Sequence, residues 1–409
     1  MAAAPLLQPR PPRPSLELAL REDICFHHPG YDSSNILFTL PRVDGVSGAG
    51  PAPTYGVHHR TALVACQIVA GNAFTNTYLA LDRAGRQRVE VPMDGVLTDS
   101  HYYFIVDGSN SYPIVPSFQD WEFPHDYIPD FWPSPAPPSG AFDPVTCGIT
   151  SVTFAIDEAH LVPQSESVWY GVNNMQRYGT GFPNIDNQAN ILPLRKDIHH
   201  CFDRRWFVIV PKIYRTETET RTAPSSQYVT HIISREAKEL WPVYHNVIVE
   251  TQPDHSRAYL FAHFAWAILS GVKFFVIQGD PRLVIRLHKD ENGKIEYKAE
   301  NCTGKVLQSQ YGGGGSLVAS PSKRKSGQRS VADNEGYSSE LSEDSDDGAG
   351  DPDRVWDMGD RWGGAERRRE QRSTDETAPD LEPDVQMKLE EALHRVMSEQ
   401  QTAASREGS

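Results

Sequence analysis

The sequence has few cysteines, and their spacing is that of neither a disulfide framework nor a zinc finger. Five cysteines are scattered singly through 409 residues, and no CxxC pair occurs. An odd number without regular spacing is typical of reduced thiols and excludes a disulfide-rich secreted scaffold. We therefore expect an intracellular protein. The short basic run KRK at 323–325 is a weak nuclear signal, so the nucleus and the cytoplasm remain the two alternatives.

Long hydrophobic runs are also scarce. The first fifteen residues are broken by prolines before an apolar stretch reaches the length of a signal peptide. The longest apolar run, AYLFAHFAWAILSGVKFFV, covers residues 258–276 and contains His263 and Lys273. It is about long enough to span a bilayer, but a charge within the bilayer is costly. A buried helix running into a strand is the preferred interpretation, and we expect no association with a membrane.

Positive charge is in the minority, since the formal net charge is −15. A uniformly acidic surface would bind nucleic acid poorly, because the neutralisation of phosphates drives that association. The acidic excess is concentrated, however: eleven acidic residues and one arginine lie between Val331 and Asp360. The net charge therefore excludes no function of the folded part, and the acidic tail becomes a candidate contact for a protein partner.

Patterning along the chain predicts an α+β protein. Strands are expected at 35–41, 77–82, 101–108, 147–156 and 204–214, and helices at 60–74 and 234–245. The predicted parts are a disordered N-terminus (1–15), an α+β domain of unknown role (16–130), a proline-rich linker (131–142), a second α+β domain with a C-terminal helical extension (143–310), and a disordered acidic tail with a candidate helix at 385–400 (311–409). We expect the two α+β parts to form one body.

Two local features are interpreted as structural and not as functional. The stretch CFHHPGY brings Cys25, His27 and His28 together, but no partner pair with zinc spacing follows, so packing is preferred over metal binding. Residues 118–140 alternate aromatic residues with prolines. Such a segment cannot form a regular helix, and we expect it to lie extended and packed across a domain surface.

The second part contains a constellation with catalytic chemistry. His160 ends a predicted strand in AHLVP, and the stretch NILPLRKDIHHCFD contains Asn190 and, nine residues later, His199. The order His, Asn, His from strand to loop to helix, with these flanking residues, resembles the HNH endonuclease family over residues 143–212. The likeness is to the kind found in predicted fungal HNH nuclease domain-containing proteins. It implies a ββα-metal finger embedded in the larger α+β body.

The resemblance also implies roles for these residues. His160 would act as general base, Asn190 would orient the base or the surroundings of the metal, and His199 would bind one divalent ion. Mg²⁺ or Mn²⁺ is expected, with Zn²⁺ as the alternative. These residue types suit phosphodiester hydrolysis, which needs a base to deprotonate water and a positive charge beside the phosphate.

One position departs from the family pattern. Many members have an acidic residue or a histidine directly before the base, where this sequence has Ala159. Glu158 is a candidate replacement, because residues two apart on a strand face the same side. Asp203 is the other, because it lies four residues after His199 on the helix and is therefore better placed than His200.

Basic residues bracket the predicted site. Arg195, Lys196, Arg204 and Arg205 are the candidates for contacts with backbone phosphates, together with Lys212. An ordinary solvated face is the alternative interpretation.

Two functions follow from these observations. The first is a metal-dependent HNH-type nuclease that hydrolyses phosphodiester bonds in DNA. The second, motivated by Ala159 and the acidic tail, is a catalytically inactive HNH-fold module that serves as a scaffold for nucleic acid or protein, with the tail or its terminal helix as a further contact.

Overall fold

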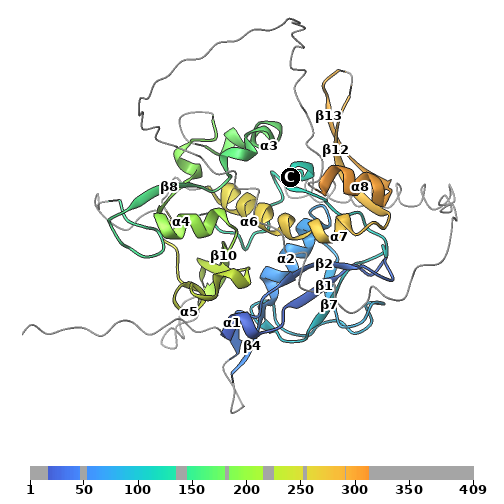
Figure 1. Cartoon of the computed structure of the whole chain (residues 1–409), viewed down its shortest axis with the longest axis horizontal. Coiled ribbons are helices and arrows are strands. Elements are labelled where there is room, and N and C mark those ends of the chain that lie inside the picture. Colours follow the sequence, from blue (N-terminus) through green and yellow to red (C-terminus); the bar gives the residue numbers. More distant parts are fainter. Residues whose placement is uncertain are drawn as a thin grey trace, which may run out of the picture. The chain divides into compact units, whose positions relative to one another are not determined.

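The structure, a computed structural model, describes residues 17–46, 53–134, 145–179, 184–214, 225–251, 256–290 and 292–312. All of them belong to one unit of the chain, residues 1–318, and residues 319–409 form a second unit. The predicted disordered N-terminus, acidic tail and terminal helix therefore lie outside the described residues. Within the described part the chain has both helices and strands, as the α+β prediction requires (Figure 1).

A four-stranded sheet organises the first part of the chain. Its strand order is β2-β1-β7-β5, with β1 antiparallel to β2 and parallel to β7. The strands are β1 (Ile24–His27), β2 (Ile36–Leu40), β5 (Thr77–Ala80) and β7 (His101–Val106). The predicted strands at 35–41, 77–82 and 101–108 are confirmed. A smaller sheet holds β3 (Asp44–Val46), β4 (Thr54–His58) and β6 (Val96–Leu97), and the helices are α1 (Glu17–Leu20) and α2 (His59–Val69).

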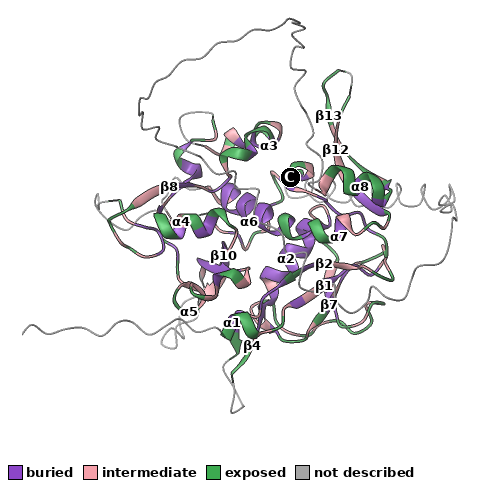
Figure 2. Ribbon diagram, viewed as in Figure 1, coloured by how far each residue is buried: buried purple, intermediate pink, exposed green. Residues whose placement is uncertain are grey.

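The long apolar run forms the central helix of the unit. Residues Arg257–Gly271 make up α6, which contacts α2, β2 and β10. Figure 2 shows this helix as the most continuously buried element. The stretch from Arg257 to Ile277 is long and apolar enough to cross a membrane, but 72% of its apolar 18-residue window is buried inside the protein. A helix that is apolar all round is expected in a protein core, so the buried-helix interpretation is confirmed.

The prediction that this helix runs directly into a strand is wrong. Residues Lys273–Ile277 continue as a further helix, α7, and the next strand begins only at Arg282. That strand, β12 (Arg282–Lys289), pairs with β13 (Ile295–Cys302) in a hairpin that projects from the unit in Figure 1. The last described helix is α8 (Gly304–Tyr311).

The aromatic–proline segment belongs to the core. Trp121 and Trp132 are fully buried, although Trp132 lies within the predicted linker. Trp121 stacks on Trp169 with ring centroids 5.6 Å apart, and Trp132 meets Phe261 of α6 edge-on at 5.0 Å. The described residues of this segment, 118–134, therefore pack against the second part of the chain through their aromatic rings.

The second part contains two antiparallel strand pairs. The strands β8 (Ile156–His160) and β9 (Ile191–Arg195) form one pair, and β10 (Phe207–Tyr214) and β11 (Ser225–Ile232) form the other. The helices are α3 (Ser167–Val172), α4 (Lys196–Asp203) and α5 (Trp241–Tyr244). The predicted strand at 204–214 is confirmed.

Two predicted elements of this part differ from the structure. The strand expected at 147–156 is a turn-rich segment, because Ser151 and Ala155 adopt left-handed backbone angles with φ of 55°. The strand begins at Ile156 instead. The helix expected at 234–245 is reduced to a 3-10 turn, Arg235–Lys238, followed by the short α5, within which Pro242 supplies no backbone N–H.

Candidate active site in the β8–β9–α4 segment

The candidate site is built on an antiparallel strand pair followed directly by a helix. In the β8–β9 pair, His160 lies opposite Ile191. The helix α4 begins immediately after β9 and packs against both strands. Ile198 and Phe202 are buried, as their four-residue spacing predicts, and the ring of Phe202 stacks on His263 of α6 at 3.9 Å. This packing fixes which face of α4 is left for polar side chains.

Asn190 is a buried connector of backbone segments. Its Oδ1 accepts a hydrogen bond from the backbone N–H of Val162 at 2.8 Å. Its Nδ2 donates to the carbonyl of Val162 at 3.0 Å and to that of Ile185 at 2.8 Å. The side chain therefore holds the chain that follows His160 against the loop that precedes β9. It acts on the position of His160 through the backbone.

His160 is paired with a carboxylate that the sequence analysis did not single out. Its Nε2 lies 3.0 Å from Oδ1 of Asp186, which also accepts a hydrogen bond from Gln164 Nε2 at 2.7 Å. The hydrogen bond from Gln164, followed by that from His160, lowers the pKa of Asp186. An ionised carboxylate at this distance orients the imidazole and selects the tautomer that carries its proton on Nε2.

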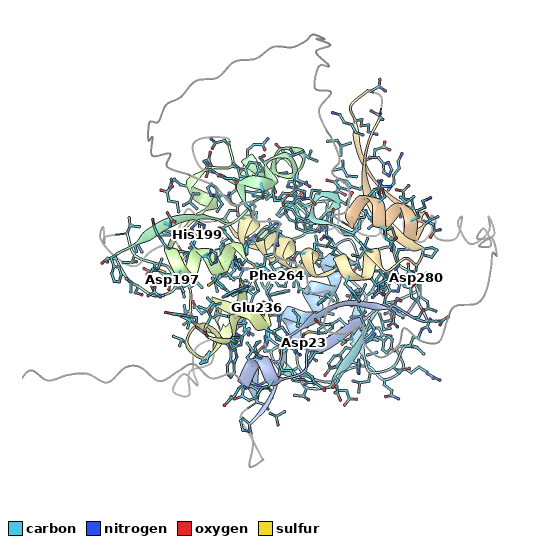
Figure 3. All side chains as sticks on the ribbon, viewed as in Figure 1. Asp23, Asp197, His199, Glu236, Phe264 and Asp280 are labelled. Carbon is cyan, nitrogen blue, oxygen red and sulfur yellow. The ribbon has the colours of Figure 1, made fainter. Side chains whose placement is uncertain are left out.

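His199 is a residue of α4 and is labelled in Figure 3. Its imidazole lies between two carboxylates. Its Nε2 is 3.3 Å from Oδ2 of Asp203, and its Nδ1 is 3.4 Å from Oδ2 of Asp157 on β8. The hydrogen bond to Asp203 raises the pKa of His199, and Asp157 acts in the same direction against the opposing effect of burial. His200, about 100° further around the helix, is exposed.

These contacts form two separate groups. Among the residues that the structure describes, no hydrogen bond or ion pair joins His160 to His199. Asp157 and His160 are three residues apart on β8, so their side chains leave the strand on opposite faces. The structure therefore has a pair, His160–Asp186, and a separate triad, Asp157–His199–Asp203.

The two candidate replacements for the missing acid fare differently. Asp203 contacts His199, as the helical spacing predicts. Glu158 is exposed, and the structure gives it no hydrogen bond or ion pair within the described residues. The carboxylate that reaches His199 from β8 is Asp157, which shares the inward face of the strand with the buried Ala159. The alternation of side chains along β8 predicts that Asp157 and Ala159 share one face. Which face of β8 lies against α4 depends on packing that the local sequence does not show.

The basic residues around the site are only partly available. Lys196 and Arg204 are exposed. Arg195 forms two hydrogen bonds with Asp197 at 2.6 and 2.7 Å, and the guanidinium of Arg205 lies 4.0 Å over the ring of Trp266. The prediction that Lys212 belongs to this basic surface is wrong. Its ammonium group is buried and pairs with Asp44 at 2.7 Å, because β10 carries it toward the first part of the chain.

Two groups of candidate metal ligands occur elsewhere in the described part of the chain. One comprises Asp44, His231 and His245, and the other Cys25, His27 and His101. In each group the ligand atoms lie within 4.8 Å of one another. Neither includes a residue of the β8–β9–α4 segment. The protein thus has possible His, Asp and Cys metal-binding groups outside the region that the sequence singled out.

Comparison with known proteins gives one match. Residues 144–210 match the family model described as HNH endonuclease. No curated protein and no solved structure matches the chain. The matched range contains β8, β9 and α4 with His160, Asn190 and His199. Residues 144–210 of this chain are therefore similar to HNH endonucleases, and this likeness supports a nuclease-type function and the binding of nucleic acid.

Proposed function

We propose that this segment is a metal-dependent nuclease that hydrolyses phosphodiester bonds in DNA, and that β8, β9 and α4 form its ββα-metal finger. The observation that carries the proposal is the pair of His160 and Asp186 at the end of β8, 3.0 Å apart. A histidine oriented by an ionised carboxylate is the arrangement that a general base requires. We also propose that the segment is of the type found in predicted fungal HNH proteins. Only the likeness of the motifs supports this finer assignment.

The hydrogen-bond pattern assigns the proton positions. With Nε2–H donated to Asp186, the lone pair of His160 is on Nδ1, for which the described residues provide no hydrogen-bond partner. Nδ1 accepts a proton from the attacking water. Asp186 then stabilises the resulting imidazolium, and Asn190 keeps the backbone after His160 in place. The imidazole side chain is 18% exposed, so substrate and water can reach it.

A divalent ion would be held by His199 together with Asp157 or Asp203. The donor set, one imidazole nitrogen and carboxylate oxygens, fits Mg²⁺, Mn²⁺ or Zn²⁺. One carboxylate can bind the ion while the other holds the second ring nitrogen, as is usual for metal-bound histidines. When bound, such an ion stabilises the charge that develops on the phosphate. Lys196 and Arg204 are the exposed cations that can meet the DNA backbone.

The alternative function is a catalytically inactive HNH-fold scaffold that binds nucleic acid or protein. The observation that favours it is the separation of His160 from the triad around His199, with buried Ala159 between them. Asp157, which contacts His199, lies about 10 Å from His160 along β8 and leaves the strand on the opposite face, whereas two groups that act on one phosphate must meet there. The two functions differ in whether cleavage occurs at all.

Cleavage tests the proposal directly. We expect purified protein to nick plasmid DNA with Mg²⁺ or Mn²⁺, and His160→Ala to reduce the rate by about 10²–10⁴-fold, the usual contribution of a general base. His200→Ala is the matched control, because His200 is an exposed histidine on the neighbouring helix. Equal nicking by wild type and His160→Ala would reject His160 as the base. No nicking by any variant would favour the scaffold.

Metal binding separates the two functions independently. Calorimetric titration with Mn²⁺ is expected to show one binding event that His199→Ala abolishes and His200→Ala preserves. The reason is that His199 alone faces the carboxylates of Asp157 and Asp203. An unchanged titration of His199→Ala would contradict the assignment of the triad.

A further inference from the structure

The outer face of the four-stranded sheet brings together three candidate metal ligands, one thiol and two imidazoles. Two of them come from β1 and the third from β7. The strands β1 and β7 pair in parallel, with Cys25 opposite His101. His27 follows two residues after Cys25 and shares its face. Ile24 and Phe26, which alternate with them, are fully buried on the inner face. The three side chains therefore gather above the two central strands, where Cys25 is half-buried and His101 is exposed.

The distances in this group match those of a metal site. The ligand atoms of Cys25, His27 and His101 all lie within 4.8 Å of one another. Nε2 of His27 and Nδ1 of His101 are 3.1 Å apart. Two imidazole nitrogens bound tetrahedrally to zinc at about 2.0–2.1 Å are separated by about 3.3 Å. The two histidines are thus already spaced for a common ion.

The tautomer of His27 is fixed in the form that binds metal. Asn35 donates from Nδ2 to the carbonyl of Tyr31 at 3.2 Å, which directs its Oδ1 toward His27. That oxygen accepts a hydrogen bond from Nδ1–H of His27 at 2.9 Å. The lone pair of the ring is then on Nε2, which faces His101. A histidine whose second nitrogen donates to an oxygen in this way is the usual form in metal sites.

We propose that Cys25, His27 and His101 form a Zn²⁺ site in the first part of the chain. A donor set of one thiolate and two imidazoles binds Zn²⁺ in preference to Mg²⁺ or Ca²⁺. The Cys25 thiol releases its proton to solvent on binding, and three protein ligands leave the fourth tetrahedral position to water. The site shares no residue with the proposed nuclease site and links β1 to β7.

The second group of candidate ligands is a poorer site. Asp44 in the Asp44–His231–His245 group already accepts a hydrogen bond from the Lys212 ammonium at 2.7 Å. A divalent cation there would meet a buried positive charge and would have to displace it. No cationic side chain hydrogen bonds to the Cys25–His27–His101 group within the part of the chain that the structure describes.

Cobalt provides the test, because Co²⁺ replaces zinc and reports its ligands by absorption. The full chain, stripped with a chelator and kept reduced, is titrated with Co²⁺. We expect one equivalent with a thiolate-to-cobalt charge-transfer band and tetrahedral ligand-field bands, which Zn²⁺ then removes. Cys25→Ser should abolish the charge-transfer band. His101→Ala should weaken binding by at least about 10-fold, since one of three ligands is lost.

Matched controls distinguish this site from the rest of the protein. Cys302→Ser and His200→Ala should keep the band, and so should His199→Ala, which alters only the proposed nuclease site. His101 is exposed, so His101→Ala provides a variant that does not disturb the core if Cys25→Ser folds poorly. The absence of a charge-transfer band in the wild type, or its survival in Cys25→Ser, would overturn the proposal.

Discussion

Lowering the pH from about 6.5 to about 4 is expected to unfold the described unit, with the uptake of at least about three protons on unfolding. Burial lowers the pKa of His28 to about 4, that of His58 to about 3 and that of His263 to about 4. An unfolded histidine titrates near about 6.5. Each of these rings is therefore neutral in the folded protein at a pH where the unfolded chain is protonated.

Burial keeps these rings neutral, although the bonds of His28 and His263 to backbone carbonyls favour the protonated form. His28 faces the carbonyl of Tyr112 with Nε2 and the backbone N–H of Gly30 with Nδ1, so one nitrogen must donate and the other accept. His263 donates from Nδ1 to the carbonyl of Leu161. Because the folded pKa values are depressed, the stabilisation is complete above the unfolded pKa and is lost as the pH falls toward the folded values. Three such groups change the free energy of unfolding by about 4 kcal/mol per pH unit.

Urea denaturation followed by circular dichroism at several pH values between about 7 and about 4.5 measures this slope. His263→Gln should reduce the slope by about 1.4 kcal/mol per pH unit, whatever its effect on stability at neutral pH, since one titrating group is removed. His200→Ala, which changes an exposed histidine, should leave the slope unchanged. A slope that corresponds to the uptake of one proton or fewer on unfolding would contradict the burial of these rings.

The second large effect is expected at the buried ion pair of Asp44 and Lys212. Lys212→Met should lower the free energy of unfolding by about 3–5 kcal/mol, because it leaves a buried carboxylate without its counter-charge. Oδ1 of Asp44 accepts hydrogen bonds from Lys212 Nζ, His245 Nε2 and Asn246 Nδ2 at 2.7, 3.0 and 3.2 Å. Burial would raise the pKa of Asp44, but Lys212 and the neighbouring histidines outweigh it, and the pKa lies well below its usual value.

Thermal and urea unfolding of Lys212→Met, with the exposed Lys196→Met as the matched control, measure this effect. Lys196→Met should change stability by less than about 0.5 kcal/mol, as is usual for surface positions. The double variant Asp44→Asn with Lys212→Met should recover part of the loss, because the unpaired charge is removed along with its partner. A loss below about 1 kcal/mol in Lys212→Met would contradict a buried pair.

Local patterns predicted those elements whose structure depends on local spacing. The helix expected at 60–74 forms over His59–Val69, and the strands expected at 35–41, 77–82 and 101–108 form within those ranges. In the site, the same reasoning gave the contact between His199 and Asp203, one helical turn apart. The strand expected at 147–156 failed because left-handed residues interrupt an apolar stretch whose composition resembles that of a strand.

Contacts between residues that are distant in the sequence could not be predicted from these local patterns. Asp186 reaches His160 from a loop 26 residues away, and no periodicity marks it. His101 joins Cys25 and His27 from a strand 74 residues beyond His27, so the cysteine and its neighbouring histidine lacked a visible partner in the sequence. The parallel pairing of β1 and β7 creates that proximity, and strand pairing is set by the packing of the whole sheet.

The position of α6 has a consequence for how this HNH segment can be inherited or transplanted. The family match ends at residue 210, whereas the helix that covers the segment begins at Arg257. His263 bonds to the carbonyl of Leu161 and stacks on Phe202, and Trp266 donates to Glu166 at 3.2 Å. The same helix contacts β10 and also α2 and β2 of the first part. The segment is therefore not a self-contained cassette: a graft into another protein would have to bring α6 along, and with it a surface shaped to fit the N-terminal sheet.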